Sequence, residues 1–384
     1  MATGGVSKAM NTKHVTYQQL IEYDVISTTN LFQPQNWAML SAGRIEDSRR
    51  FVVVDASIEK QYRSAIYDYF KYHHIEAKVV AFPGGEENKT LEHYLAIARE
   101  LDTFPIHRRD EPIIAIGGGV LTDLVGFVAA SYRRGVPYIK VPTTLMGYVD
   151  ASIGIKTGFN FNGNKNRLGA FHAPQRVILD KEFLKTLPRR HLLNGVCEII
   201  KLAIIKDLQL FELLEACGVQ SVQEHFQNKE SSILLDRAIT GMLEELEPNL
   251  FEEELARKVD FGHTFSYGLE TRHEAHLLHG EAVLLDILLS SLIARARDLL
   301  TDTEASRIFQ LVHRLGYEFD ASILDPYLLL ASLTERTYHR NGLQRVPMPN
   351  RIGNCTFLND IQADEVESAA KTLIDWITIK HEII

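Results

Sequence analysis

The sequence predicts an α/β N-terminal domain with a parallel sheet, followed by an all-α C-terminal domain. Two observations carry this prediction. Short apolar runs alternate with amphipathic helical stretches in the first half, whereas the second half shows helical spacing with almost no strand signal. The length of 384 residues is enough for two such cores. We place a polar leader at 1–20, the α/β domain at 21–187 and the helical domain at 188–384.

The predicted strands of the first half are short runs rich in Val and Ile, which is typical of parallel strands buried on both faces. They are expected at 50–57, 78–90 (with its turn), 112–119 and 138–144. Between them, apolar residues recur at helical spacing. Helices are therefore expected at 58–73, from the turn at 90 to about 102, and at 120–131.

The second half begins at Leu187–Pro188 and carries its apolar residues at helical spacing. Helices are expected at 191–207, 208–217, 230–246, 281–298 and 303–315. The most apolar stretch, 282–294, contains Asp286 and is too short to span a membrane, so it predicts a buried helix.

Composition narrows the classes of partner and compartment. A net charge of -9 argues against nucleic acid as the main partner, because binding a phosphate backbone needs a cationic surface. The three cysteines form no Cys-x-x-Cys pair and are too few for a disulfide framework. The N-terminus lacks the apolar core of a signal peptide. A cytoplasmic protein without a membrane partner is expected.

A glycine turn follows the strand at 112–119 and opens a helix. Glycine lets the backbone approach a pyrophosphate, whose charge then lies at the positive end of the helix. The spacing is not Gly-x-Gly-x-x-Gly, so a purely structural turn is the alternative. Acidic and basic residues at neighbouring strand ends strengthen the prediction of a Rossmann-like nucleotide site, although Asp55 alone is also explained as a helix N-cap. These residues are Asp55, Glu86, Lys89 and Asp123.

Glu198 and Lys201 share one face of an otherwise apolar helix with Asn194. Buried polar groups are costly unless paired or bound to a ligand, and an internal Glu198–Lys201 ion pair is one explanation. Two histidines, His263 and His279, lie beside glycines on what are expected to be successive helices. Two imidazoles and one carboxylate make a catalytic Zn²⁺ site with open positions.

Spacing alone leaves two nearby histidines, His273 and His276, as alternative ligands. A satisfied core histidine is commoner than a metal ligand, but the combination with a buried glutamate favours the metal site.

Cations and amides cluster after Asp150 in a stretch that we expect to be mostly loop. Lys156, Lys165 and Asn166 follow it, and Arg134 lies just upstream. A solvated basic face is the usual explanation for such a run. Alternation with glycine and asparagine after a buried strand favours a phosphate pocket, to which Arg340 adds a weaker contribution.

Taken together, these motifs resemble the dehydroquinate synthase superfamily, the sugar phosphate cyclases, over residues 45–360. The resemblance rests on GGGVLTDLVGF, PTTLMGYVDASIGIKTG, NGVCEIIK, DFGHTFSYGLE and LLHGEAV. It implies a Rossmann-like NAD⁺ domain, a helical domain holding Zn²⁺ or Co²⁺, a homodimer, and a small sugar phosphate as substrate. The implied reaction is transient oxidation by NAD⁺, β-elimination of phosphate, reduction and intramolecular aldol closure.

The resemblance also implies a role for each matching residue. Metal ligands fall on Glu198, His263 and His279. NAD⁺ contacts fall on Asp55, Glu86, Lys89, Gly118, Gly119, Asp123, Thr143 and Thr144. Catalytic roles fall on Asp150, Lys156, Asn166 and Lys201. Substrate contacts fall on Arg134 (reaching across the dimer), Lys165, Asp260, Tyr267 and Arg340.

Two departures from dehydroquinate synthases indicate the substrate. Asp260 and Tyr267 replace the asparagine and histidine usual there, and Asp260 with the NFNGNKNR segment resembles the branch that cyclises sedoheptulose 7-phosphate to epi-valiolones. The expected product is 2-epi-5-epi-valiolone. Tyr267 stands where proline is usual in that branch, so the C5 epimer, 2-epi-valiolone, stays open. Desmethyl-4-deoxygadusol and 3-dehydroquinate synthases, a metal-dependent polyol dehydrogenase and a catalytically silent nucleotide-binding regulator are the rivals.

Overall fold

The computed structural model describes residues 12–45, 48–270 and 277–379. The N-terminal half is built on one six-stranded sheet, in the order β1-β8-β5-β4-β2-β3, in which every described pair is parallel. Its strands are β1 (Asp24–Thr28), β2 (Arg49–Asp55), β3 (Glu76–Phe82), β4 (Ile113–Gly117), β5 (Tyr138–Pro142) and β8 (Arg176–Asp180). Four of these were predicted; β1 and β8, which pair with each other at one end of the sheet, were not.

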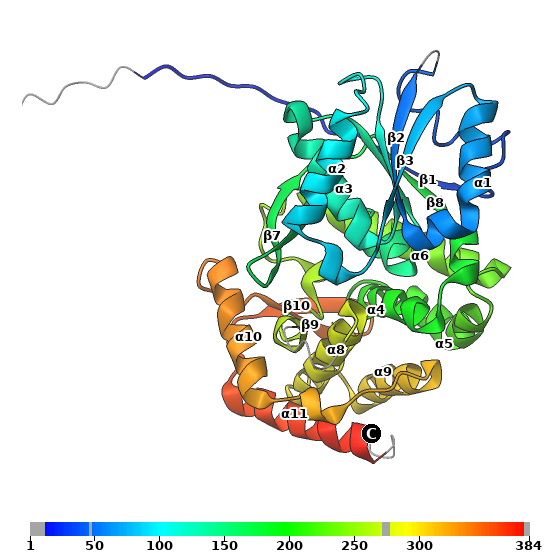
Figure 1. The fold of residues 1–384 in the computed structure, drawn as a ribbon. Coiled ribbons are helices and arrows are strands. Elements are labelled where there is room, and N and C mark those ends of the chain that lie inside the picture. Colours follow the sequence, from blue (N-terminus) through cyan, green and yellow to red (C-terminus); the bar gives the residue numbers. More distant parts are fainter. Residues whose placement is uncertain (1–11, 46–47, 271–276, 380–384) are drawn as a thin grey trace, which may run out of the picture.

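Helices cover both faces of this sheet (Figure 1). Helix α1 (Ala56–Tyr72) packs on one face, and α2 (Leu91–Asp102) with α3 (Gly119–Ser131) on the other. Side chains alternate accordingly: Val52 and Val54 point to the α1 side, Phe51 and Val53 to the α3 side. Both faces are buried, which explains why the strands are continuous apolar runs.

The stretch predicted as mostly loop is instead an antiparallel hairpin of β6 (Lys156–Phe161) and β7 (Asn164–Phe171). Its two-residue turn, Asn162 and Gly163, has φ of +49° and +74°. Asn-Gly is a strong signal for such a turn. The prediction was wrong because the flanking residues are polar, so the alternation that identifies a strand is absent.

Helices dominate the C-terminal half, shown below the sheet domain in Figure 1, and the predicted fold class is confirmed. The helices are α4 (Arg189–Ile205), α5 (Leu208–Gln223), α6 (Lys229–Leu246), α7 (Ser266–Glu270), α8 (His279–Ala296), α9 (Asp302–Leu315), α10 (Pro326–His339) and α11 (Ala363–Thr378). A hairpin of β9 (Val346–Arg351) and β10 (Asn354–Leu358) was not predicted, because Pro347 and Pro349 of β9 interrupt the strand pattern.

Helix α8 is surrounded by other elements, including α4, α9, α11 and β9. Fourteen of its residues are buried, so it is the central helix of this half, as its uniformly apolar sequence predicts. Among the described residues, no helix is both long and apolar enough to cross a bilayer.

Candidate active site

A carboxylate and two imidazoles converge in the C-terminal half. Glu198 comes from the middle of α4, His263 from the turn before α7, and His279 is the first residue of α8. One ligand atom from each lies within 4.8 Å of the others. The sequence placed His263 on a helix, which is wrong: Gly262 (φ +77°) precedes it in an irregular turn. His273 and His276 lie outside the described residues.

The Glu198 carboxylate is fully buried, and burial raises its pKa to about 7. Neither of its oxygens has a hydrogen-bond partner of good geometry among the described residues. The charged groups beside it are the Lys201 ammonium, with which it forms an ion pair, and His279, whose Nε2 lies 3.7 Å from Oε1. A buried carboxylate without hydrogen bonds is costly, and a bound cation would remove that cost. The site therefore fits a divalent metal.

In both imidazoles Nδ1 has a partner, which leaves Nε2 for a metal. Nδ1 of His263 lies 3.0 Å from the Phe261 carbonyl, and Nδ1 of His279 lies 3.0 Å from Oε1 of Glu270. Burial, followed by the Lys201 and His279 charges, lowers the pKa of His263 to about 3. A neutral imidazole with a free Nε2 is the form that binds a metal.

The turn that carries His263 is fixed by a buried carboxylate on α8. Oδ2 of Asp286 accepts the backbone N–H groups of Thr264, Phe265 and Ser266 at 2.7, 2.5 and 3.0 Å. Since α8 also begins with His279, both histidines are positioned by one helix. From the sequence, Asp286 argued only against a membrane span; an isolated carboxylate within an apolar helix was the available signal for this role.

The same helix is joined to α4 by Asn194, whose Oδ1 accepts the Gly280 N–H at 2.7 Å. The polar face that the sequence predicts for α4 therefore has two roles. Asn194 sets the start of α8, while Glu198 and Lys201 lie at the cluster. The Glu198–Lys201 ion pair considered as an alternative is present, but it adjoins the two histidines rather than replacing them.

Asp150 brings the sheet domain to this cluster. It lies on a π-helical turn, Gly147–Ala151, and its Oδ2 is 3.8 Å from Nζ of Lys201. Burial acts to raise the pKa of Asp150, but Lys201, Lys156 and His263 outweigh it and lower that pKa to about 2. Although burial acts in the opposite direction, Asp150 and Glu198 raise the pKa of Lys201. The site thus holds a charged lysine next to a charged carboxylate.

Two cations of the hairpin contact acidic partners, although the Lys156 side chain is 64% exposed. Lys156 Nζ lies 3.2 Å from Oε1 of Glu252, and Lys165 pairs with Glu270. Both partners belong to the C-terminal half, so the hairpin connects the two halves beside the metal cluster.

The residues predicted for the nucleotide gather at the carboxyl ends of β2, β3 and β4. Lys89 is almost buried and donates to Asp123 Oδ2 (2.7 Å) and Asn166 Oδ1 (2.5 Å), and Glu86 accepts from Asn160 (2.8 Å). Asp55 caps α1 by accepting from Ser57 N at 2.9 Å, as the alternative explanation held.

The glycine turn leaves the start of α3 open. Gly118 is the N-cap and supplies no capping side chain, so the first-turn N–H groups are available to an anion. A Cβ on Gly119 would lie 2.8 Å from Cβ of Ala151, and one on Gly118 would lie 3.1 Å from Thr144 Cγ2. Thr143 and Thr144 follow β5, where Thr143 N donates to the Gly117 carbonyl at 3.0 Å. The turn therefore fits a pyrophosphate.

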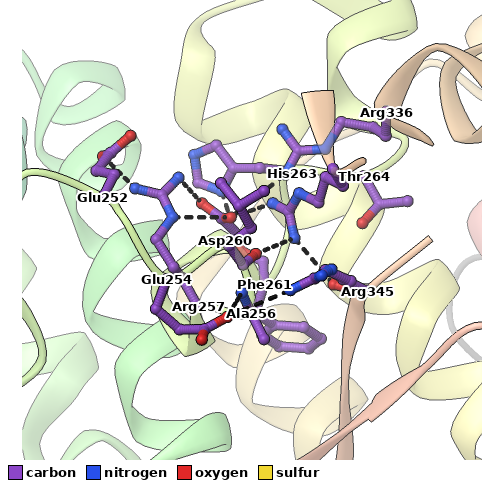
Figure 2. Close-up of polar contacts among 12 residues, drawn as sticks. Glu252, Glu254, Ala256, Arg257, Asp260, Phe261, His263, Thr264, Arg336 and Arg345 are labelled. Carbon is purple, nitrogen blue, oxygen red and sulfur yellow. Dashed lines mark hydrogen bonds and ion pairs between the residues drawn. The ribbon is translucent and has the colours of Figure 1, made fainter. Parts of the chain in front are cut away.

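Asp260 lies among guanidinium groups (Figure 2). Its carboxylate accepts from Arg257 Nε at 3.1 Å, contacts Arg340, and lies 3.5 Å from Arg336 Nη2. Burial acts to raise the pKa of Asp260, but the three arginines lower it to about 2. The Asp260 carbonyl accepts the His263 N–H at 3.0 Å, so this charged cluster directly precedes the metal ligand.

Of two further predicted substrate residues, Tyr267 contacts the hairpin, whereas Arg134 lies at the far end of α3. Tyr267 donates its hydroxyl to Oδ1 of Asn164 at the tip of the hairpin, at 3.3 Å. Arg134 is exposed, has a left-handed φ of +63°, and follows the C-terminal end of α3. The rise of α3 puts it about 20 Å from the glycine turn. Within one chain, the structure does not bring Arg134 to the other predicted residues.

Two protein-family descriptions match consecutive segments of this chain. The 3-dehydroquinate synthase N-terminal family matches residues 79–194, and the C-terminal family matches 195–337. A 2-epi-5-epi-valiolone synthase from Streptomyces albus is 47% identical over 95% of this chain and 90% of its own length. The chain belongs to the 3-dehydroquinate synthase family of sugar phosphate cyclases.

Two further relatives place this cyclase within the family. A demethyl-4-deoxygadusol synthase from Trichormus variabilis is 37% identical over 93% of the cyclase chain and 88% of its own length. The solved structure of a 2-epi-5-epi-valiolone synthase from Streptomyces hygroscopicus, with NAD⁺ and Zn²⁺ bound, superposes with a TM-score of 0.91 at 40% identity. It covers 94% of the cyclase and 99% of that chain.

Proposed function

We propose that this cyclase converts sedoheptulose 7-phosphate to 2-epi-5-epi-valiolone with loss of phosphate, using NAD⁺ and a divalent metal. It would then be a phosphorus–oxygen lyase. One observation carries the proposal: the Glu198, His263 and His279 cluster adjoins Lys201 and Asp150 in a chain 47% identical to a synthase of that name. Zn²⁺, or Co²⁺ in its place, suits two imidazole nitrogens and one carboxylate oxygen.

Bound NAD⁺ would supply transient oxidation at C5, and the bound metal would polarise the sugar oxygens next to it. Glu198, His263 and His279 would hold the metal. The open N-terminus of α3, with Lys89, Asp123 and Thr144 around it, would hold the dinucleotide.

The remaining residues act directly on the sugar phosphate. The Lys201 ammonium stabilises negative charge that develops on an oxygen beside the cluster, and Asp150, 3.8 Å away, keeps that ammonium oriented. Lys156, Lys165 and Asn166 lie on the hairpin, where they can exchange their present partners for phosphate oxygens. The leaving phosphate, held by these residues, would accept the C6 proton on one of its own oxygens as the C–O bond to it breaks.

The Asp260 cluster supports a substrate without a carboxylate. A heptulosonate carries one, and arginines near the metal site would attract it. Here the buried Asp260 anion already pairs with three guanidiniums and weakens their attraction for a second carboxylate. This arrangement favours a heptulose, which has an uncharged group where a heptulosonate has its carboxylate.

Tyr267 makes 2-epi-valiolone the second candidate product. Tyr267 belongs to α7 and its phenol contacts Asn164 on the hairpin, so it can restrict the sugar ring beside the hairpin before aldol closure. Incubation with sedoheptulose 7-phosphate, NAD⁺ and Zn²⁺, followed by phosphate assay and NMR, tests both. Phosphate release with the 2-epi-5-epi product is expected. Turnover of 3-deoxy-arabino-heptulosonate 7-phosphate alone, or stoichiometric NADH release, would overturn the proposal.

A further inference from the structure

A buried carboxylate outside the ligand set joins the metal cluster to the hairpin. Glu270 is the last residue of α7, and its side chain is 8% exposed. Oε1 lies 3.0 Å from Nδ1 of His279, while Oε2 pairs with Nζ of Lys165, 105 residues away in the sequence. Its two oxygens therefore contact one residue from each half of the molecule.

The contact with His279 determines which ring nitrogen is free. A carboxylate that accepts the Nδ1 proton leaves the lone pair on Nε2, and that atom lies 3.7 Å from Oε1 of Glu198. Glu270 therefore contacts the imidazole with one oxygen and the ammonium with the other.

We propose that Glu270 is a positioning residue that holds His279 in its metal-binding tautomer, with Lys165 fixing the carboxylate while no sugar phosphate is bound. This inference rests on the metal site of the proposed function, and it adds a residue that is not a ligand. Carboxylates in this relation to a ligating histidine contribute about 10–100-fold to metal affinity.

The test measures Zn²⁺ binding to the metal-free full chain, by competition with a chromogenic chelator and without sugar. Glu270→Gln should weaken affinity about 10–100-fold, because an amide can present its N–H₂ to Nδ1 and reverse the tautomer. Co²⁺ added to the same variant should give an altered d–d absorption spectrum.

Glu281→Gln is the matched control. Glu281 lies on α8, two residues after His279. Unlike Glu270, it accepts from Leu278 N and Arg190 and not from the imidazole. It should bind Zn²⁺ within about threefold of wild type. Equal affinity in wild type and Glu270→Gln would overturn the role of Glu270, whereas a wild-type chain that binds no Zn²⁺ would overturn the metal site itself.

Thermal unfolding of the metal-free variants shows whether each is folded. Should Glu270→Gln fail to fold, Glu270→Asp keeps the charge but shortens the reach to Nδ1. It should lower Zn²⁺ affinity about 3–10-fold, and wild-type affinity in that variant would contradict the proposal.

Discussion

At the scale of single residues, Asp260 illustrates how one buried charge sets the potential around a site. Its carboxylate contacts Arg257, Arg336 and Arg340, and its carbonyl holds the N–H of the neighbouring His263. Asparagine at this position would keep the size and remove the charge. The three guanidiniums would then be free to attract an anion.

We expect Asp260→Asn to bind 3-deoxy-arabino-heptulosonate 7-phosphate roughly tenfold more tightly as a competitive inhibitor, since one charge-assisted contact is worth about 1.4 kcal/mol. The free energy of unfolding should fall by about 3 kcal/mol, because buried arginines lose their partner. Inhibition assays and urea unfolding measure both. Glu254→Gln alters the contact with Arg345 in the same cluster and should leave inhibition unchanged. Unchanged inhibition in Asp260→Asn would show that this charge does not select the substrate.

Residue types indicated much of this site. Glu198, His263 and His279 were predicted from their chemistry and from the resemblance, and the structure brings them together. Glu270 and Asp286 were missed, because a carboxylate on a helix is usually solvated and their partners lie 9 to 105 residues away. Such partners are visible only once the fold is known.

At the scale of elements, α8 organises the metal site. It supplies His279 at its first turn and Asp286 two turns later, and Asp286 fixes the His263 turn through three backbone N–H groups. Asp286→Ala should lower the free energy of unfolding by about 2–4 kcal/mol, since buried donors lose their acceptor. Ser290→Ala removes only the 3.0 Å bond to Asp286 Oδ1 and should cost about 1 kcal/mol. Chemical unfolding of both variants checks this; equal losses would contradict the role of Asp286.

Strand β5 carries a fully buried lysine, Lys140, which donates to the Gly154 carbonyl at 2.8 Å. Burial lowers its pKa to about 8 from an ordinary 10.5. Between these pH values the unfolded chain binds a proton that the folded chain does not, so folding gains stability as pH rises through this window. Relative to Lys140→Met, wild type should gain about 3 kcal/mol between pH 7.5 and 10.5. Urea unfolding across that range measures the difference, and parallel curves would refute it.

The strength of the strand signal decided which elements were predictable. Strands β2, β4 and β5 are almost entirely buried and rich in apolar residues, and the half-buried edge strand β3 still has four apolar residues in a row at 79–82. The β6–β7 hairpin is polar, and β9 contains Pro347 and Pro349, so neither shows the expected alternation. Their pairing depends on contacts with the rest of the molecule that the local sequence does not encode.

At the scale of the whole molecule, Arg134 is a predicted substrate residue that lies far from the other predicted site residues of its own chain. It lies about 20 Å from the glycine turn, at the other end of α3. We propose a homodimer in which Arg134 reaches the phosphate of the partner subunit's site. Tyr17 and Leu20 line one pocket with Arg134 and are 84% and 78% exposed in the single chain, and a partner subunit would cover them.

Mixing two inactive variants tests this arrangement. Lys156→Ala should bind NAD⁺ yet turn over poorly, and Arg134→Ala should lose phosphate affinity. After subunit exchange at equal amounts, half of the dimers are mixed and each has one intact site, so about a quarter of wild-type activity should return. A mixture that stays inactive while size measurements show mixed dimers would place Arg134 in its own chain's site.

The pairing of β1 with β8 affects the order in which the sheet assembles during synthesis as well as the stability of the finished sheet. Asp24 and Arg176 form an ion pair across these strands although 152 residues separate them. At ribosomal rates of about 5–20 residues per second, the first strand waits roughly 8–30 s for its neighbour to be synthesised. Once β5 has been synthesised, one side of it also lacks its neighbour until β8 follows. In order of synthesis the sheet can therefore assemble from its β3 edge through β2, β4, β5 and β8, and β1 is made first but joins last.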